Sequence, residues 1–127
     1  MTEEEQLVDA FFLREKKERY KEFIRNPKKR NMFLAEMAHF SGLNVRVRHD
    51  IPKLAQTFEG IVRLLKENGA SETCLAISDI DEIDGKRLTL QDAIGTILGR
   101  TYGTFLSCLP ARLAYFENED GRWILKR

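Results

Sequence analysis

An excess of charge of one sign is absent from this sequence. Its 127 residues carry 21 Lys and Arg against 20 Asp and Glu, which leaves a formal net charge of +1. A chain with so balanced a charge has no global field that would draw it to nucleic acid or to an anionic membrane. Any basic binding site must therefore be local.

Long hydrophobic runs are also missing, and cysteine is scarce. No segment approaches the length of a membrane span. The first residues do not resemble a secretory signal, because Thr2–Gln6 is acidic and Asp9 interrupts the short apolar patch Leu7–Leu13. Cys74 and Cys108 are too few for a disulfide framework, and both lie in apolar segments where cysteine is usually a small buried hydrophobe. We expect a reduced, cytoplasmic setting and no membrane partner.

The motifs of the common enzyme and cofactor families are absent as well. The chain has no Walker or Rossmann glycine pattern, no HExxH and no cysteine–histidine spacing typical of zinc. Hydrophobic residues make up 43% and charged residues 32%, which is enough apolar material for the core of one domain of this length. We expect a single domain over residues 1–127, with no cofactor and no metal.

Helical patterns are the first features that the sequence does contain. Four helices are predicted, at residues 3–25, 27–40, 58–68 and 90–98. Asn26-Pro27 separates the first two, because asparagine caps free backbone amides and proline suits the first helical position. These two helices are expected to form an antiparallel hairpin.

Segments with a period of two complete the pattern. Strands are predicted at residues 43–49, 73–78, 104–109, 112–117 and 122–126. The second is apolar on both faces, which favours a central place in the sheet. The last three form an antiparallel meander. The prediction is a two-layer α+β domain in which an antiparallel sheet of about five strands carries the helices on one face.

The acidic stretch Asp79–Gly85 places four carboxylates within six residues, and such oxygens could surround a hard cation. An EF-hand loop needs glycine at its sixth position and a carboxylate at its twelfth. Counted from Asp79, these positions hold Asp84 and Leu90. We interpret the stretch as a solvated turn, and the sequence leaves open whether a looser site holds a cation.

Arginine and histidine gather on the first predicted strand. Arg46 and Arg48 share its polar face, and His49 offers a titratable group beside them. In a regular strand His49 lies on the opposite face from the two arginines. These three residues are candidates for binding an anionic metabolite. His39, in an apolar stretch of the second helix, is interpreted as a packed or partly exposed side chain.

Local basic clusters suggest nucleic acid as an alternative partner. Lys28–Arg30 begins the second predicted helix, and Arg46 and Arg48 follow on the strand. Arg100 near Tyr102 adds an aromatic ring close to positive charge. Positive charges at a helix start oppose the helix dipole, so Lys28–Arg30 could equally be a solvated surface.

The aromatic residues of the meander alternate between its two faces. If Phe105 and Phe116 face the helices, Tyr115 lies on the other side and needs cover from another element or from a partner. Tyr115 and Trp123 are therefore the candidate contact residues for a protein partner or for self-association.

The stretch Gly103–Glu117, with Ile83-Asp84-Gly85 before it, resembles the tail of short bacterial hypothetical proteins over half of the chain. The resemblance implies a bacterial cytoplasmic setting and supplies no mechanism and no site residues. The function expected from the sequence is a non-catalytic protein-binding or regulatory module. Nucleic-acid binding is the first alternative, and a small enzyme acting on an anionic metabolite is the second.

Overall fold

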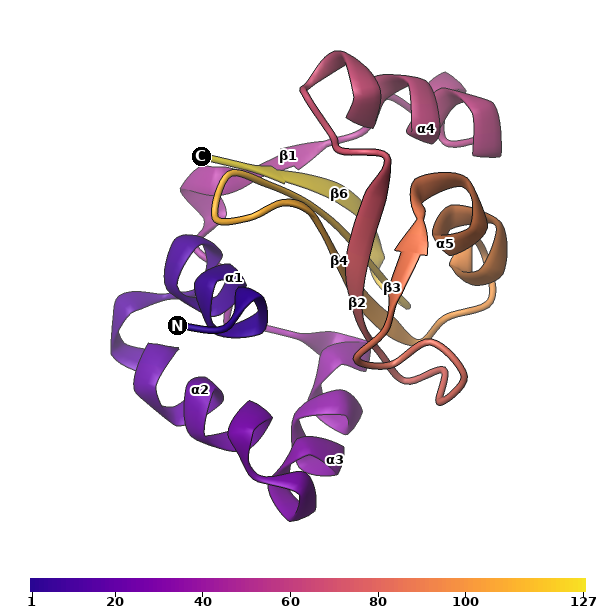
Figure 1. Cartoon of the computed structure of the whole chain (residues 1–127). Coiled ribbons are helices and arrows are strands. Elements are labelled where there is room, and N and C mark those ends of the chain that lie inside the picture. Colours follow the sequence, from indigo (N-terminus) through magenta and orange to yellow (C-terminus); the bar gives the residue numbers. More distant parts are fainter.

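A single antiparallel sheet organises this chain, whose computed structural model describes all of residues 1–127. Its six strands lie in the order β1-β6-β5-β4-β2-β3. They are β1 (Arg48–Asp50), β2 (Thr73–Ser78), β3 (Arg87–Thr89), β4 (Gly103–Leu109), β5 (Leu113–Asn118) and β6 (Gly121–Lys126). The α-helices are α1 (Glu3–Phe11), α2 (Lys17–Arg25), α3 (Pro27–Glu36), α4 (Phe58–Glu67) and α5 (Leu90–Ile97) (Figure 1). The predicted α+β class is confirmed, with six strands in place of about five.

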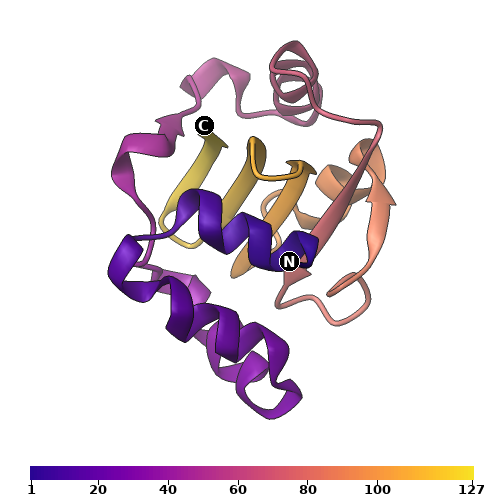
Figure 2. The same ribbon diagram turned by 60° about the vertical axis from the view of Figure 1, so that its left-hand side comes forward.

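Helices cover both faces of this sheet, so the molecule has three layers rather than the two that were predicted. The helices α1, α2 and α3 lie on one side, and α4 and α5 lie on the other (Figure 1, Figure 2). Strand β5 shows the reason, because Ala114 and Phe116 join the N-terminal core while Leu113 and Tyr115 join the core under α4 and α5. A sheet that is apolar on both faces needs a layer on each.

Aromatic rings fill the core beneath the N-terminal helices. Phe105 and Phe116 are cross-strand partners in β4 and β5, and their rings stack with centroids 4.1 Å apart. Phe40, which follows α3, lies edge-on to both rings. Aromatic pairs of this kind add to the stabilisation that burial provides.

The predicted N-terminal helix is broken near its middle. Phe12 is extended and bridges to Leu43, and the amide of Leu13 donates to the carbonyl of Gly42 at 2.8 Å. These backbone bonds to a distant segment replace helical ones, and α2 begins only after a 3₁₀ turn at Arg14–Lys16. The prediction of one continuous helix was therefore wrong, whereas the hairpin of α2 and α3 is present (Figure 2).

The other helices begin at the predicted capping residues. The side chain of Asn26 accepts a hydrogen bond from the amide of Lys28, and that of Thr57 accepts one from Gly60. Each cap satisfies a backbone donor that the helix leaves free. No helix is both long enough and apolar enough to cross a membrane.

Two strands of three residues form the edges of the sheet. Strand β3 was not predicted, and the predicted strand at 43–49 is a strand only from Arg48, because a 3₁₀ turn occupies Val45–Val47. Arg48, Asp50 and Arg87 place charge on these edges. Short, charged edges disfavour pairing with a strand of another chain.

Candidate functional site

Helices cover the sheet face on which Tyr115 was expected to contact a partner. Tyr115 is 0% exposed beneath α4 and α5, and its hydroxyl donates to the carboxylate of Glu117 at 2.7 Å. Burial, reinforced by Glu117, raises the pKa of Tyr115 far above its ordinary value. Trp123 lies on the opposite face of the sheet, half-buried against Phe116. Tyr115 and Trp123 therefore do not form one contact surface.

The residues of the predicted arginine strand are exposed but do not converge. Arg46 lies in the 3₁₀ turn, while Arg48 and His49 occupy successive positions of β1 and point to opposite faces of the sheet. The guanidinium of Arg48 stands over the indole ring of Trp123, 5.2 Å from its centroid. Arg48 and His49 therefore do not face a common pocket.

One member of the basic segment Lys28–Arg30 is occupied by ion pairs. Arg30 is only 17% exposed and donates to Glu4 and Asp84 at distances between 2.6 and 2.9 Å. The segment begins α3, at the far end of the molecule from β1 (Figure 1). The proposed nucleic-acid cluster is thus divided between two separate surfaces.

Two of the four carboxylates of the acidic turn, Asp79 and Asp84, also have protein partners. Asp84 binds Arg30 and accepts from the amide of Ser78, and Asp79 accepts from the hydroxyl of Thr101 at 2.5 Å. No group of three or more histidine, cysteine or acidic side chains in the chain is arranged to hold a metal ion. The stretch is a turn, as interpreted, and the contacts of Asp79 and Asp84 hold its two ends.

A row of polar side chains crosses four strands on the face that α5 covers. Strand register places Ser78, Thr104, Glu117 and Arg122 side by side. The Ser78 and Thr104 hydroxyls are 2.6 Å apart, and Glu117 accepts from the amide of Gly99 at 2.8 Å. Buried polar groups are costly unless they are hydrogen-bonded. These bonds therefore allow the row to lie in an otherwise apolar core.

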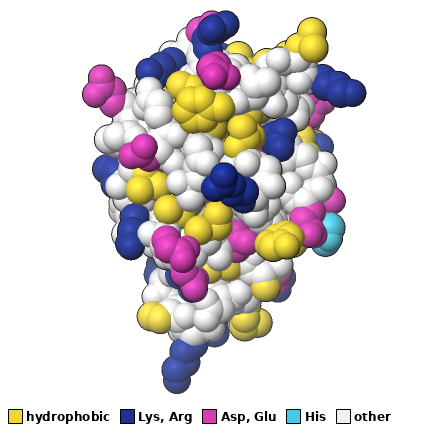
Figure 3. Space-filling model, turned by 90° about the vertical axis from the view of Figure 1, so that its right-hand side faces the viewer, with side chains coloured by type: hydrophobic (Ala, Val, Ile, Leu, Met, Phe, Trp, Pro, Cys, Tyr) yellow, Lys and Arg dark blue, Asp and Glu magenta, His cyan; other side chains and the backbone are white.

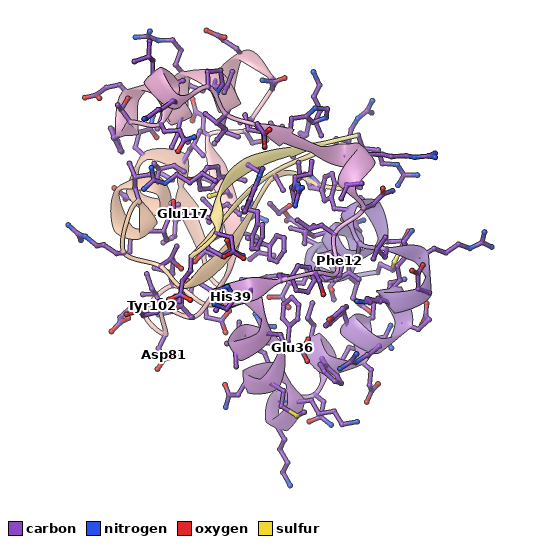
Figure 4. The ribbon with its side chains drawn as sticks, turned by 180° about the vertical axis from the view of Figure 1, so that it is seen from behind. Phe12, Glu36, His39, Asp81, Tyr102 and Glu117 are labelled. Atoms are coloured by element: carbon purple, nitrogen blue, oxygen red, sulfur yellow. The ribbon has the colours of Figure 1, made fainter.

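The row ends in a cleft of about 530 Å³ at one end of the sheet. Arg100 and Tyr102, from the loop after α5, line one side, and Glu119 and Asp120, from the β5–β6 turn, line another. Arg122 contributes to its inner wall. Figure 4 shows Glu117, Tyr102 and His39 grouped at this end of the molecule.

His39 contacts the two residues of the β5–β6 turn, Glu119 and Asp120. Its Nε2 lies 3.1 Å from Glu119 and its Nδ1 lies 3.0 Å from Asp120. It is an exposed residue of the 3₁₀ turn that follows α3. Neither Glu117 nor Arg122 was predicted from the sequence. The one available signal was a charged residue at the end of the apolar run Leu113–Phe116.

A second candidate surface surrounds α4 and the turn before it. Leu54 is 96% exposed in that turn. It borders a groove of about 410 Å³ that Pro52 and Leu64 also line, and a second groove of about 520 Å³ is lined by Phe58 and Val62. Apolar side chains gather among charged ones on the face seen in Figure 3. We call residues 52–67 the α4 surface.

Comparison with known proteins identified no relative. No family model, no curated protein and no solved structure matches this chain. The molecule itself offers two candidate sites: the cleft that Arg100, Tyr102, Glu119, Asp120 and Arg122 line, which we call the polar cleft, and the α4 surface.

Proposed function

We propose that this protein is a non-catalytic protein-binding module that contacts its partner through the α4 surface. The observation that carries the proposal is the exposure of Leu54, a large aliphatic side chain that is 96% exposed. Leu54 borders one groove of the α4 surface, and a second groove lies along the same helix. Burying a leucine side chain contributes about 1.5–3 kcal/mol. A partner that covers Leu54 gains this free energy on binding.

The charges on α4 indicate the chemistry of the partner. Glu59, Arg63 and Glu67 are spaced four residues apart and border both grooves, so they form a charged ridge between them. An amphipathic helix suits such a surface, with apolar residues for the grooves and a basic–acidic–basic series facing the ridge. We propose that the partner is a different protein and not a second copy of this chain that pairs strand to strand, because the sheet edges are short and charged.

The cellular setting that we propose is a bacterial cytoplasm. One observation supports the reducing compartment: Cys74 and Cys108 are both free and buried. The bacterial part of the proposal rests on the sequence resemblance of Gly103–Glu117 alone. Unpaired thiols are the usual state of cysteine in reducing compartments.

A site-specific photo-crosslinking experiment tests the proposal. A photoreactive amino acid at Leu54 is expected to capture one protein, and the same amino acid at Met32, which is 54% exposed on α3, is not. The captured protein is then purified and titrated against the module. Leu54→Glu should weaken binding by about 30-fold, since about 2 kcal/mol of burial is lost, while Met32→Glu should leave it unchanged.

Three results of that experiment would contradict the proposal. Equal capture at both positions would show that Leu54 marks no specific surface. Crosslinks only between copies of this chain would assign the α4 surface to self-association. A captured partner whose affinity is unaffected by Leu54→Glu would place the contact elsewhere. The Leu54→Glu variant should fold normally, because a side chain that is 96% exposed contributes almost nothing to the core.

A further inference from the structure

The polar cleft contains an arginine whose hydrogen-bonding capacity is mostly unused. Arg122 lines two adjoining cavities, of about 530 and 580 Å³. Its Nε lies 3.4 Å from Glu117, and its Nη1 donates to Gln56 at 3.5 Å. A guanidinium offers five N–H donors in a planar fork, and both of these contacts are long. The remaining donors of Arg122 are therefore free for a ligand.

The groups around Arg122 are themselves held by hydrogen bonds. Glu117 is buried and is itself held by the hydroxyl of Tyr115 and the amide of Gly99. Gly99 has a φ of +73°, a left-handed conformation that brings the loop after α5 close to the guanidinium. A Cβ at Gly99 would lie 3.7 Å from Nη2 of Arg122. This arrangement holds the guanidinium of Arg122 at the cleft before a ligand arrives. A guanidinium binds a planar anionic group through two parallel hydrogen bonds.

The second cation of the cleft is Arg100, which is exposed and forms no ion pair in the structure. Tyr102 stands beside it with 62% of its surface exposed. An exposed aromatic ring next to a polar cleft offers a flat apolar face to the body of a ligand.

Negative charge on the other wall decides which kind of ligand fits. Glu119 and Asp120 line the cleft together with Arg100 and Arg122, and buried Glu117 adds a third carboxylate beside Arg122. His39 lies against both residues of this turn: its Nε2 is 3.1 Å from Oε2 of Glu119, and its Nδ1 is 3.0 and 3.2 Å from the two carboxylate oxygens of Asp120. Oε1 of Glu119 accepts no hydrogen bond from the protein. A simple anion would be repelled by these carboxylates. A ligand that carries both signs would satisfy both walls.

We propose that the cleft binds a small zwitterion of the α-amino-acid class. Arg122 and Arg100 receive its carboxylate, Glu119 and Asp120 receive its ammonium group, and Tyr102 packs against its side chain. This proposal is independent of the α4 surface, because a variant such as Leu54→Glu leaves every one of these groups in place.

Matched small molecules provide the test. The probes are L-phenylalanine and L-leucine, the acid 3-phenylpropanoate, the amine 2-phenylethylamine, and inorganic phosphate. Binding is followed in the ¹⁵N-labelled protein by amide shifts and measured by calorimetry. We expect saturable binding of at least one of the two amino acids, with the largest shifts at Gly99–Tyr102 and Gly121–Arg122, and at least tenfold weaker binding of the acid, the amine and phosphate.

Substitutions then locate the bound molecule. Arg100→Gln, at an exposed position that does not affect folding, should weaken amino-acid binding about tenfold, the loss of one charge-assisted contact. Arg63→Gln, on the remote α4 helix, is the matched control and should have no effect. Binding of 3-phenylpropanoate or phosphate as tightly as the amino acids would overturn the zwitterion assignment. Failure of both amino acids to bind, or equal effects of the two substitutions, would overturn the site.

Discussion

Arg30 and Asp84, which lie 54 residues apart in the chain, form an ion pair through two hydrogen bonds of 2.9 and 2.8 Å. The same guanidinium makes two further bonds to Glu4 on α1. Arg30 therefore connects α3, α1 and the turn between β2 and β3. Asp84 in turn accepts from the backbone of Ser78 at the end of β2. One side chain thus links the N-terminal helices to the sheet.

Loss of this arginine should destabilise the fold. Arg30→Ala leaves two partly buried carboxylates unpaired, and we expect the free energy of unfolding to fall by about 2–3 kcal/mol. Arg30→Lys should recover only part of this, because an ammonium group cannot form the two parallel bonds. Urea denaturation measures both. Lys28→Ala, at an exposed position two residues away, is the control, and an equal loss there would show that the ion pairs contribute nothing specific.

Acid should weaken the fold through Glu5. Its carboxylate accepts from the backbone and hydroxyl of Thr2 in a capping box and pairs with Arg25. These contacts, the Thr2 amide first, lower the pKa of Glu5 from 4.5 to about 2. Because the folded-state pKa lies below the unfolded one, the stabilisation is complete above pH 4.5 and is lost as the pH falls toward 2.

Comparing Glu5→Gln with the wild type isolates this contribution. The wild type should lose more stability than the variant between pH 4.5 and pH 2, as measured by denaturant titration at each pH. Glu15→Gln, in the exposed 3₁₀ turn, should behave like the wild type. Parallel pH profiles for the wild type and Glu5→Gln would remove Glu5 as a source of acid sensitivity.

The two thiols should be unreactive in the folded protein. Burial raises the pKa of Cys74 to about 12 and that of Cys108 well above its ordinary value, and neither is more than 1% exposed. Since the thiolate is the nucleophile, a thiol-specific disulfide reagent should modify neither residue until denaturant is added. A Ser71→Cys variant, exposed just before β2, should react at once. Rapid modification of the native wild type would contradict the burial of both thiols.

Local signals predicted much of the fold because several elements begin and end by local chemistry. Strand β2 matches the predicted range of 73–78, and α5 begins after Thr89, as the capping pattern indicated. The break after α1 depends on Leu43, which lies some 30 residues along the chain from Phe12, and no local pattern encodes such a bridge. Strand β3 is only three residues long and has no detectable period.

The third layer did have a sequence signal. Strand β2 was recognised as apolar on both faces, and Tyr115 was recognised as needing cover on the second face of the meander. The cover comes from α4 and α5, which the sequence placed correctly along the chain but not in space. The cleft around Arg122 could not be predicted, because its walls come from three separate loops that only the folded chain brings together.

Arg48 should shield the only tryptophan of the chain. Its guanidinium lies over the ring of Trp123, and such a contact at an exposed site contributes about 0.5–1 kcal/mol. Arg48→Ala should shift the fluorescence of Trp123 to longer wavelength and increase its quenching by acrylamide. Arg46→Ala, which removes a neighbouring exposed arginine, should change neither property. Unchanged fluorescence in Arg48→Ala would mean that the two side chains are apart in solution.

We expect Glu117 to hold Tyr115, Gly99 and Arg122 together at the inner side of the cleft and thereby to stabilise the fold. Glu117→Ala removes the acceptor for Tyr115 and for Gly99 and leaves Arg122 without its carboxylate partner, so the free energy of unfolding should fall by about 3 kcal/mol. Tyr115→Phe removes a single hydroxyl and should cost about 1 kcal/mol.

A double-substitution cycle separates the two effects. Glu117→Ala combined with Tyr115→Phe should cost less than the sum of the single changes, because both remove the hydrogen bond between the two side chains. The amide proton of Gly99, which donates to the carboxylate, should move upfield in Glu117→Gln. Glu119→Gln, on the exposed turn two residues away, is the control for stability. Strict additivity, with an unmoved Gly99 amide, would mean that Glu117 does not organise the cleft.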